Sequence, residues 1–291
     1  MTIGIIGLGL IGGSMAKAFR RDPESVILGM DTDERTVEAA LLSRDMNGRL
    51  TEDKYGLCGL ILLAAYPQGT EEWLRENAAR IPAHVLVVDC LGVKGKICRT
   101  GFELAERHGF TFVGGHPMAG TQYSGFRYAK EDMFDGSTMV LVPPAEADAA
   151  LIERVKGCFA PARFGRFIIT TAEKHDAMIA FTSQLAHVVA SSYIKSPTAD
   201  APEGFSAGSY RDLTRVAWLS PELWTELFLE NGDRVTAEID HLIGHLKEYR
   251  DAIAARDRDT LYRLLDEGRM RKKMVDERWQ PVRLMYPELR S

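Results

Sequence analysis

Short apolar runs alternate with helical stretches over the first part of the chain. Residues 2–6 form an apolar, β-branched run of the kind that fills a buried parallel strand. Strands that alternate with helices of ordinary length predict a parallel, doubly wound sheet. The predicted strands cover residues 2–6, 26–30, 57–65, 85–89, 110–115, 139–143 and 167–169, and the predicted helices cover residues 15–20, 34–42, 69–80, 96–108 and 147–158.

The pattern changes near Thr170 to long helices without a convincing strand. Helices are predicted over residues 173–194, 221–255 and 260–279, and the apolar positions of the second fall mostly on one face. We therefore predict two domains, residues 1–169 and residues 170–291, the second of them all-α. Three long helices make a thin core for one chain, so we expect a second copy to complete it as a homodimer.

The turn after the first strand contains three glycines in the spacing Gly7-x-Gly9-x-x-Gly12 and leads directly into a helix. The first glycine allows a tight turn, the second allows backbone to approach a pyrophosphate, and the third allows the helix to pack closely on the strand. Phosphates bind at such a helix N-terminus. The pattern predicts a Rossmann-type dinucleotide-binding domain, with cofactor contacts from Gly7, Leu8, Gly9, Leu10, Ile11 and Gly12.

Asp31 follows the predicted second strand, roughly twenty residues after the glycines, where this type of domain places an acid. Its carboxylate would accept hydrogen bonds from ribose hydroxyls and repel a 2′-phosphate, which favours NAD over NADP. Arg35 leaves NADP as the alternative. The other interpretation is a glycine-rich turn in an ordinary α/β domain, with Asp31 as a loop acid.

Composition excludes several classes of protein. The net charge of −5 gives no general attraction to nucleic acid or to an acidic membrane, and no apolar run approaches membrane-spanning length. The four cysteines lack paired metal-type spacing, and His241 and His245 lack a third ligand, so no metal site is expected. Because the first strand begins at once, we expect no signal peptide and a cytoplasmic location.

Ligands of such sheets lie at the carboxyl ends of the strands. The loops at this edge are expected at residues 7–12, 31–33, 64–68 and 89–94. Gly92 lies in the last of these loops and is expected near the cofactor. His116 directly follows the strand at residues 110–115, so it should lie at the same edge.

Several ordered motifs then resemble the prephenate/arogenate dehydrogenase family of tyrosine biosynthesis. They are His-Pro-Met-Ala-Gly-Thr-Gln-Tyr-Ser-Gly at residues 116–125, Thr-Ser-Gln-Leu-Ala-His at 182–187 and Ser-Tyr-Arg-Asp-Leu-Thr-Arg at 209–215. The resemblance implies oxidative decarboxylation of prephenate to 4-hydroxyphenylpyruvate with NAD, or of arogenate to tyrosine. It also implies a small-molecule substrate. The homodimer is expected from the thin helical core, and no membrane or nucleic acid is expected as partner from the charge and hydropathy.

The resemblance assigns roles to individual residues. His116 matches the catalytic histidine, whose neutral imidazole can accept a hydroxyl proton. Arg215 matches an arginine that grips a substrate carboxylate through two hydrogen bonds. Three further substrate contacts are expected from His187, Ser124 and Thr121, although His187 can also be read as a core residue.

Arg211 could be a second cation for the substrate, or it could pair with Asp212 in a structural cluster. Lys94 is expected to order its loop or the cofactor rather than to act chemically.

The chain departs from the family at four positions. Gly92 stands where many members have a serine that orients the catalytic histidine, Gln122 replaces an acid, Gln184 replaces a histidine found in some members, and Ala186 replaces proline. Two rival functions remain: a β-hydroxyacid or imino-acid oxidoreductase, and a regulatory protein that senses NAD without turnover. After Ser291 we expect no regulatory domain.

Overall fold

The computed structural model describes residues 1–121, 123–200, 204–205 and 208–285. The chain forms two compact units, Met1–Val235 and Thr236–Ser291. The predicted domain boundary after residue 169 stays a prediction.

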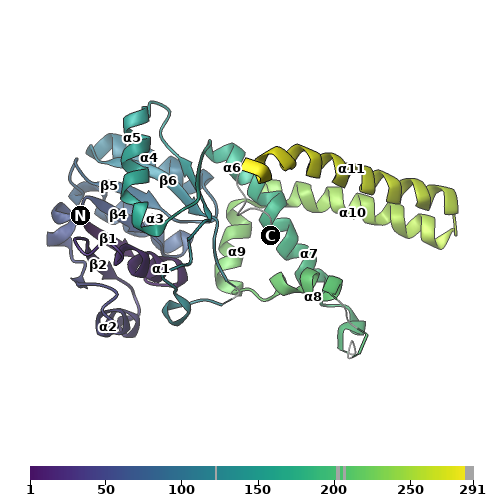
Figure 1. Cartoon of the computed structure of the whole chain (residues 1–291), viewed down its shortest axis with the longest axis horizontal. Coiled ribbons are helices and arrows are strands. Elements are labelled where there is room, and N and C mark those ends of the chain that lie inside the picture. Colours follow the sequence, from purple (N-terminus) through teal and green to yellow (C-terminus); the bar gives the residue numbers. More distant parts are fainter. Residues whose placement is uncertain (122, 201–203, 206–207, 286–291) are drawn as a thin grey trace. The chain divides into compact units, whose positions relative to one another are not determined.

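Strands from the described residues of the first unit form one eight-stranded sheet in the order β3-β2-β1-β4-β5-β6-β7-β8. Figure 1 labels β1, β2, β4, β5 and β6 of this sheet. Neighbouring strands are parallel at each step except between β6 and β7. This architecture confirms the predicted α/β Rossmann-type class. The strands are β1 Thr2–Ile6, β2 Val26–Met30, β3 Gly48–Arg49, β4 Leu60–Leu63, β5 Leu86–Asp89, β6 Thr111–Pro117, β7 Thr138–Val142 and β8 Arg166–Ile169.

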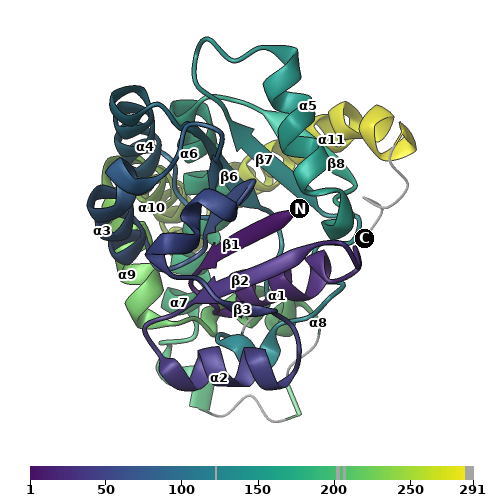
Figure 2. The ribbon, with the colours of Figure 1, turned by 90° about the vertical axis from the view of Figure 1, so that its left-hand side faces the viewer.

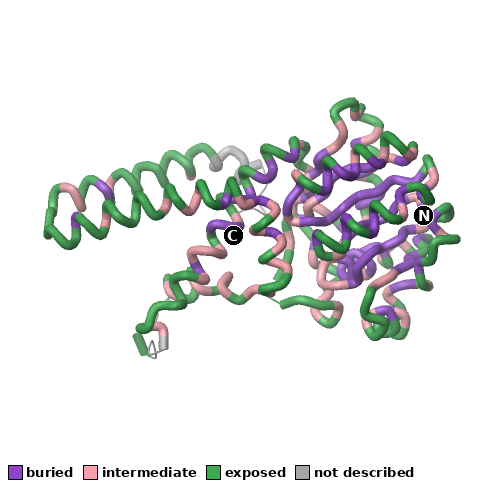
Figure 3. The backbone as a smooth tube through the Cα atoms, turned by 180° about the vertical axis from the view of Figure 1, so that it is seen from behind, coloured by how far each residue is buried: buried purple, intermediate pink, exposed green. Residues whose placement is uncertain are grey.

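Helices cover both faces of the sheet (Figure 2). Because successive strand residues point to opposite faces, Ile3 and Ile5 pack in one core with α1, α2 and α5, whereas Ile6 packs in the other with α3 and α4. The strands lie within the buried part of the molecule (Figure 3). The helices are α1 Leu10–Phe19, α2 Glu34–Leu42, α3 Pro67–Asn77, α4 Gly95–His108 and α5 Ala149–Cys158.

The antiparallel pairing of β7 with β6 differs from the prediction of a parallel sheet. A parallel neighbour needs a crossover, usually a helix, on one face of the sheet. The connection between Pro117 and Thr138 contains only the short 3₁₀ turn Phe126–Tyr128 among its described residues, and the chain re-enters the sheet in the opposite direction. The two-residue strand β3 was also not predicted, because such a short segment leaves no periodic pattern.

After β8 the first unit is helical. The predicted helix over 173–194 is present as α6 Ala172–Ile179, a π-helical turn at Ala180–Leu185, and α7 Ala186–Tyr193. Two further helices follow, α8 Gly208–Thr214 and α9 Pro221–Glu230.

The prediction of one helix over residues 221–255 is wrong at Asn231. This residue separates α9 from α10 (Gly232–Ala254) with a non-helical backbone, φ −114° and ψ 22°. Its side-chain amide donates to the Asp176 carbonyl at 2.9 Å and to Gln184 Oε1 at 2.6 Å, and the residue is buried. These hydrogen bonds fix Asn231 outside the helical geometry.

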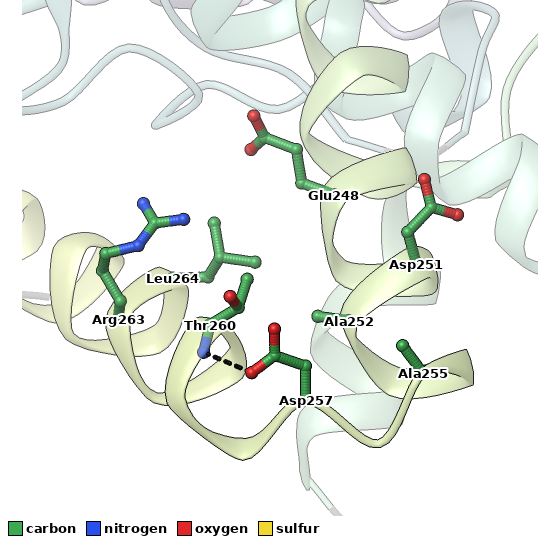
Figure 4. Close-up of a pocket in the computed structure, with 8 residues that line it drawn as sticks. All are labelled: Glu248, Asp251, Ala252, Ala255, Asp257, Thr260, Arg263 and Leu264. Atoms are coloured by element: carbon green, nitrogen blue, oxygen red, sulfur yellow. Dashed lines mark hydrogen bonds between the residues drawn. The ribbon is translucent and has the colours of Figure 1, made fainter.

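The second unit consists of most of α10 and of α11 (Arg258–Met285), which lie side by side as a hairpin (Figure 1). The Tyr249 hydroxyl donates to the Leu264 carbonyl at 3.0 Å across the two helices. A hollow of about 350 Å³ lies beside the hairpin turn, lined in part by Asp251, Asp257 and Arg263 (Figure 4). In the described residues, no helix has both the length and the apolar character needed to span a membrane.

Candidate functional site

The glycine loop joins β1 to α1 and cannot accept larger residues at two of its glycines. Gly7 has φ +87°, and a Cβ there would lie 2.6 Å from the Ala65 nitrogen. A Cβ on Gly12 would lie 1.9 Å from the Gly7 carbonyl oxygen. Gly9 is the N-cap of α1 and has nothing within 4 Å of its Cβ position. The loop therefore leaves space beside the helix N-terminus, as an anion site needs.

Asp31 fixes this loop from the end of β2. Its Oδ2 accepts the backbone N–H of Leu8 at 2.7 Å, and its Oδ1 accepts that of Asp33 at 2.9 Å. Each carboxylate oxygen has a further lone pair, so the partly exposed Asp31 can still accept from ribose hydroxyls. Leu10 and Ile11 begin α1 and are partly buried. The open helix N-terminus at Gly9 fits the pyrophosphate of a dinucleotide, and Asp31 fits its ribose.

His116 is the penultimate residue of β6, which extends two residues beyond the strand predicted at 110–115, so His116 lies within the carboxyl end of the strand rather than after it. Its Nδ1 is 2.9 Å from Nε2 of His175, a residue of α6. The Nδ1 of His175 is in turn 2.7 Å from Oδ1 of Asp176. His175 and Asp176 are 4% and 1% exposed, whereas His116 is half-buried. Two imidazoles and a carboxylate thus form a continuous chain of hydrogen bonds.

Burial lowers the pKa of His116 well below its ordinary value of 6.5, and the charges of His175 and Lys94 act in the same direction. Burial also lowers the pKa of His175, although the hydrogen bond to Asp176 opposes it. Burial would raise the pKa of Asp176, but hydrogen bonds from His175 and from the backbone N–H groups of Lys94 and Gly95 hold it below 3.8. At neutral pH the hydrogen-bonded series His116–His175–Asp176 therefore consists of two neutral imidazoles and one carboxylate.

Lys94 connects the loop after β5 to the strand that carries His116. Its ammonium group is fully buried, pairs with Asp89, and donates to the Gly115 carbonyl at 2.5 Å. Asp89 Oδ1 also accepts the N–H of Gly115 at 3.1 Å. These bonds support the prediction that Lys94 orders its loop, and they fix the backbone immediately before His116.

The loop that follows His116 folds back onto α1. The backbone N–H of Lys130 donates to Ser14 Oγ at 3.0 Å, and Phe126 packs so closely that a Cβ on Gly13 would lie 2.7 Å from its ring. Thr121 Oγ1 accepts the N–H of Tyr123 at 3.2 Å, and both Thr121 and Ser124 are exposed. Gln122 lies outside the described residues.

His187 and Arg215 come together from α7 and the turn at Arg215–Ala217. Nδ1 of His187 is 2.7 Å from the Val216 carbonyl, which can only accept, and its ring packs on Trp224 with the centroids 3.8 Å apart. Burial lowers the pKa of His187; the hydrogen bond to the Val216 carbonyl opposes this shift, and the charge of Arg215 adds to it. His187 is therefore a neutral imidazole whose Nε2 is an acceptor.

The guanidinium groups of Arg215 and Arg211 belong to exposed residues and form no ion pair with the described part of the chain. In particular, the described residues show no ion pair between Arg211 and Asp212, so the structural alternative for Arg211 is wrong. Both cations are available to an anionic ligand.

Two residues of the site were not predicted. His175 and Asp176 lie inside a predicted helix, where they appear only as polar positions on a helical face. A His-Asp pair at the start of that helix was the available signal. Its meaning depends on contact with His116, which is 59 positions away along the chain.

A doubly wound sheet with an open glycine turn at the start of α1 and an acid at the end of β2 defines a dinucleotide-binding domain of the dehydrogenase type. Residues 15–168 match the family description "Prephenate dehydrogenase, nucleotide-binding domain". Residues 171–267 match "Prephenate dehydrogenase, dimerization domain".

Two characterised relatives and one solved structure extend this match. The chain is 30% identical to the prephenate dehydrogenase of Bacillus subtilis, over 90% of this chain and 72% of that one. It is 31% identical to the cyclohexadienyl dehydrogenase of Zymomonas mobilis, over 89% and 90%. The prephenate dehydrogenase of A. aeolicus, solved with hydroxyphenyl propionate and NAD+, has a TM-score of 0.80 and 25% identity over 94% of this chain and 98% of that chain. The chain belongs to the prephenate dehydrogenase family.

Proposed function

We propose that the chain catalyses the NAD-dependent oxidative decarboxylation of prephenate to 4-hydroxyphenylpyruvate, a step in tyrosine biosynthesis. The observation that carries the proposal is His116, which is held neutral at the end of β6 in a chain of this family. Arogenate, which would give tyrosine directly, is the second candidate substrate. We retain this candidate because one of the similar proteins is named cyclohexadienyl dehydrogenase.

The cofactor is proposed to bind where the glycine loop is open. The N-terminus of α1 at Gly9 would hold the pyrophosphate, and Asp31 would hold the ribose and disfavour the 2′-phosphate of NADP. Gly92, in the loop after β5, is a further proposed contact. NAD supplies the hydride acceptor of the reaction.

His116 is proposed as the general base. Its lowered pKa keeps the imidazole unprotonated at neutral pH, so that it can accept the proton of the ring hydroxyl. Loss of carbon dioxide then needs little assistance, because it makes the ring aromatic.

The substrate carboxylates are proposed to bind the cations of the helical segment. Arg215 presents a planar fork of donors without an ion-pair partner in the described residues, which suits a carboxylate. Arg211 is a second cation, and His187 offers its Nε2 as an acceptor. Thr121 and Ser124 are proposed to donate from the exposed loop after His116.

The test is NADH formation with prephenate, arogenate and a small hydroxy acid in parallel, for the wild type and His116→Asn. We expect turnover of prephenate or arogenate, and a loss of roughly 10²–10⁴-fold in kcat for the variant, because the base is removed. NAD affinity, measured by calorimetry, should not change. The exposed His84→Asn is the control and should behave like the wild type.

Unchanged turnover in His116→Asn would contradict the assignment of the base. NAD binding without turnover of any of the three substrates would instead favour a sensor of NAD.

A further inference from the structure

We propose that His175 and Asp176 position His116 for proton abstraction, by fixing its tautomer and by stabilising the charge that it acquires. The inference rests on the proposed function, in which His116 is the base. It assigns a role to two residues that belong to α6 rather than to the sheet edge.

The tautomers follow from the order of donors and acceptors. The Asp176 carboxylate can only accept, so Nδ1 of His175 carries a hydrogen and donates to it over 2.7 Å. In the neutral ring, Nε2 of His175 is then an acceptor. It lies 2.9 Å from Nδ1 of His116, which must therefore carry the hydrogen of that ring. This leaves Nε2 of His116 with its lone pair, free to accept a proton.

The same order explains how charge is stabilised. When the substrate O–H bond breaks and the proton joins Nε2 of His116, this ring becomes an imidazolium ion. Its Nδ1–H donates more strongly to His175, whose Nδ1–H in turn donates to the carboxylate of Asp176. One buried negative charge is thus connected to the new positive charge through a single neutral ring, whereas in a Ser-His-Asp triad the carboxylate bonds the catalytic histidine directly.

Asp176 does not need His175 to fulfil its structural role. Its two oxygens already accept the backbone N–H groups of Lys94 at 2.8 Å and Gly95 at 2.7 Å, which caps the N-terminus of α4. His175 adds a third bond to an oxygen that is already engaged. A buried imidazole is not required for the cap, but it is required to reach His116.

His175 also orients His116, which Gly92 cannot do. A glycine has no hydroxyl to orient the histidine, and its Cβ position faces Leu227 at 3.4 Å rather than a polar group. The charged groups around the two imidazoles are Asp176 on α6, Asp89 at the end of β5 and Lys94 in the loop that follows, and the last two pair with each other. Asp176 is therefore the one carboxylate bonded to this chain of rings in the described structure.

The first experiment reads the tautomer without any substrate. Imidazole ¹⁵N NMR of the labelled wild type, assigned with His116→Asn, should show His116 protonated at Nδ1. In His175→Phe the acceptor is lost, and His116 should change to a mixture of tautomers. A wild-type His116 protonated at Nε2 would overturn the inference even in a protein without turnover.

The second experiment compares the kinetics of His175→Phe and His175→Gln. His175→Phe should lower kcat roughly 10- to 10³-fold, part of the 10²- to 10⁴-fold effect of a general base, with NAD affinity unchanged. The Gln side chain can still present an acceptor to His116, so this variant should retain more activity than His175→Phe.

Thr100→Val is the stability control, since Thr100 lies on α4 and its hydroxyl bonds to Glu71 and Arg75 of α3, so the change removes hydrogen bonds between these two helices. It should lower the melting temperature without changing kcat of the folded enzyme. Equal losses of kcat in both His175 variants and in Thr100→Val would show a structural role and overturn the inference. If the wild type turns over neither prephenate nor arogenate, the proposed function fails and the NMR result alone decides this inference.

Discussion

His116 and His175 affect stability as well as chemistry, because each has a lower pKa in the folded protein than in the unfolded chain. Below about pH 6.5, the ordinary value for histidine, the unfolded chain binds protons that the folded protein does not. The folded state is therefore favoured above this pH and loses stability as the pH falls towards the folded pKa values.

We accordingly expect the free energy of unfolding, measured with urea, to fall between pH 7.5 and pH 5.5. In the double variant His116→Asn/His175→Phe, the fall should be smaller, because two of the responsible groups are gone. Glu230 works in the other direction, since burial raises its pKa, but it is the same in both proteins. Parallel pH profiles for the two proteins would contradict this explanation.

At the scale of single residues, sequence motifs locate His116 and the glycine loop but not the partners of His116. A motif is a local pattern, whereas His175 acquires its meaning from a contact made by folding. The departure at Gln184 is also explained only in three dimensions. Its amide donates to the Leu227 carbonyl at 2.8 Å and its oxygen accepts from Asn231, so Gln184 joins α9 to the π-helical turn.

At the scale of elements, the junction between α9 and α10 depends on Asn231. Its amide group satisfies two buried acceptors, the Asp176 carbonyl and Gln184 Oε1. We expect Asn231→Ala to lower the free energy of unfolding by about 1–3 kcal/mol, the cost of leaving buried polar groups without partners. Asn231→Asp should cost more, because it places acceptors against acceptors.

Urea denaturation measures both changes, with the exposed Thr236→Ala as the control. A loss no larger than that of the control would mean that backbone geometry alone ends α9.

Periodicity predicts where elements lie better than how they end or pair. It finds the helices on both sides of Asn231. The apolar positions continue on one face across this junction, so periodicity does not reveal that α9 ends there. It also finds β7, yet the direction of this strand depends on the connection after Pro117, in which apolar spacing carries no information about crossover or reversal.

At the scale of the whole molecule, the unit Thr236–Ser291 has several large apolar side chains on its surface. Leu246, Ile253, Tyr262 and Leu265 are between 57% and 72% exposed. A pair of helices with this much uncovered apolar surface is typical of an interface. Together with the match to a dimerization domain, this supports the predicted homodimer.

We expect light scattering at micromolar concentration to give twice the chain mass of 32.4 kDa. Leu246→Glu and Ile253→Glu should shift the protein towards the monomer, because a charge in an apolar interface is costly to bury. Lys247→Glu, a change at an exposed charged position, is the control. A wild type that is monomeric at this concentration would contradict the predicted homodimer.

Asp176 has a consequence for how this protein can change over time or under engineering. One carboxylate both caps α4 and ends the chain of imidazoles, so a substitution there disturbs the scaffold and the base in a single step. The side chain of His175 bonds to Asp176 and His116 and does not bond to the N-terminus of α4. A change of the working pH is therefore accessible through position 175 without loss of the cap, whereas position 176 can change only together with a new cap for α4.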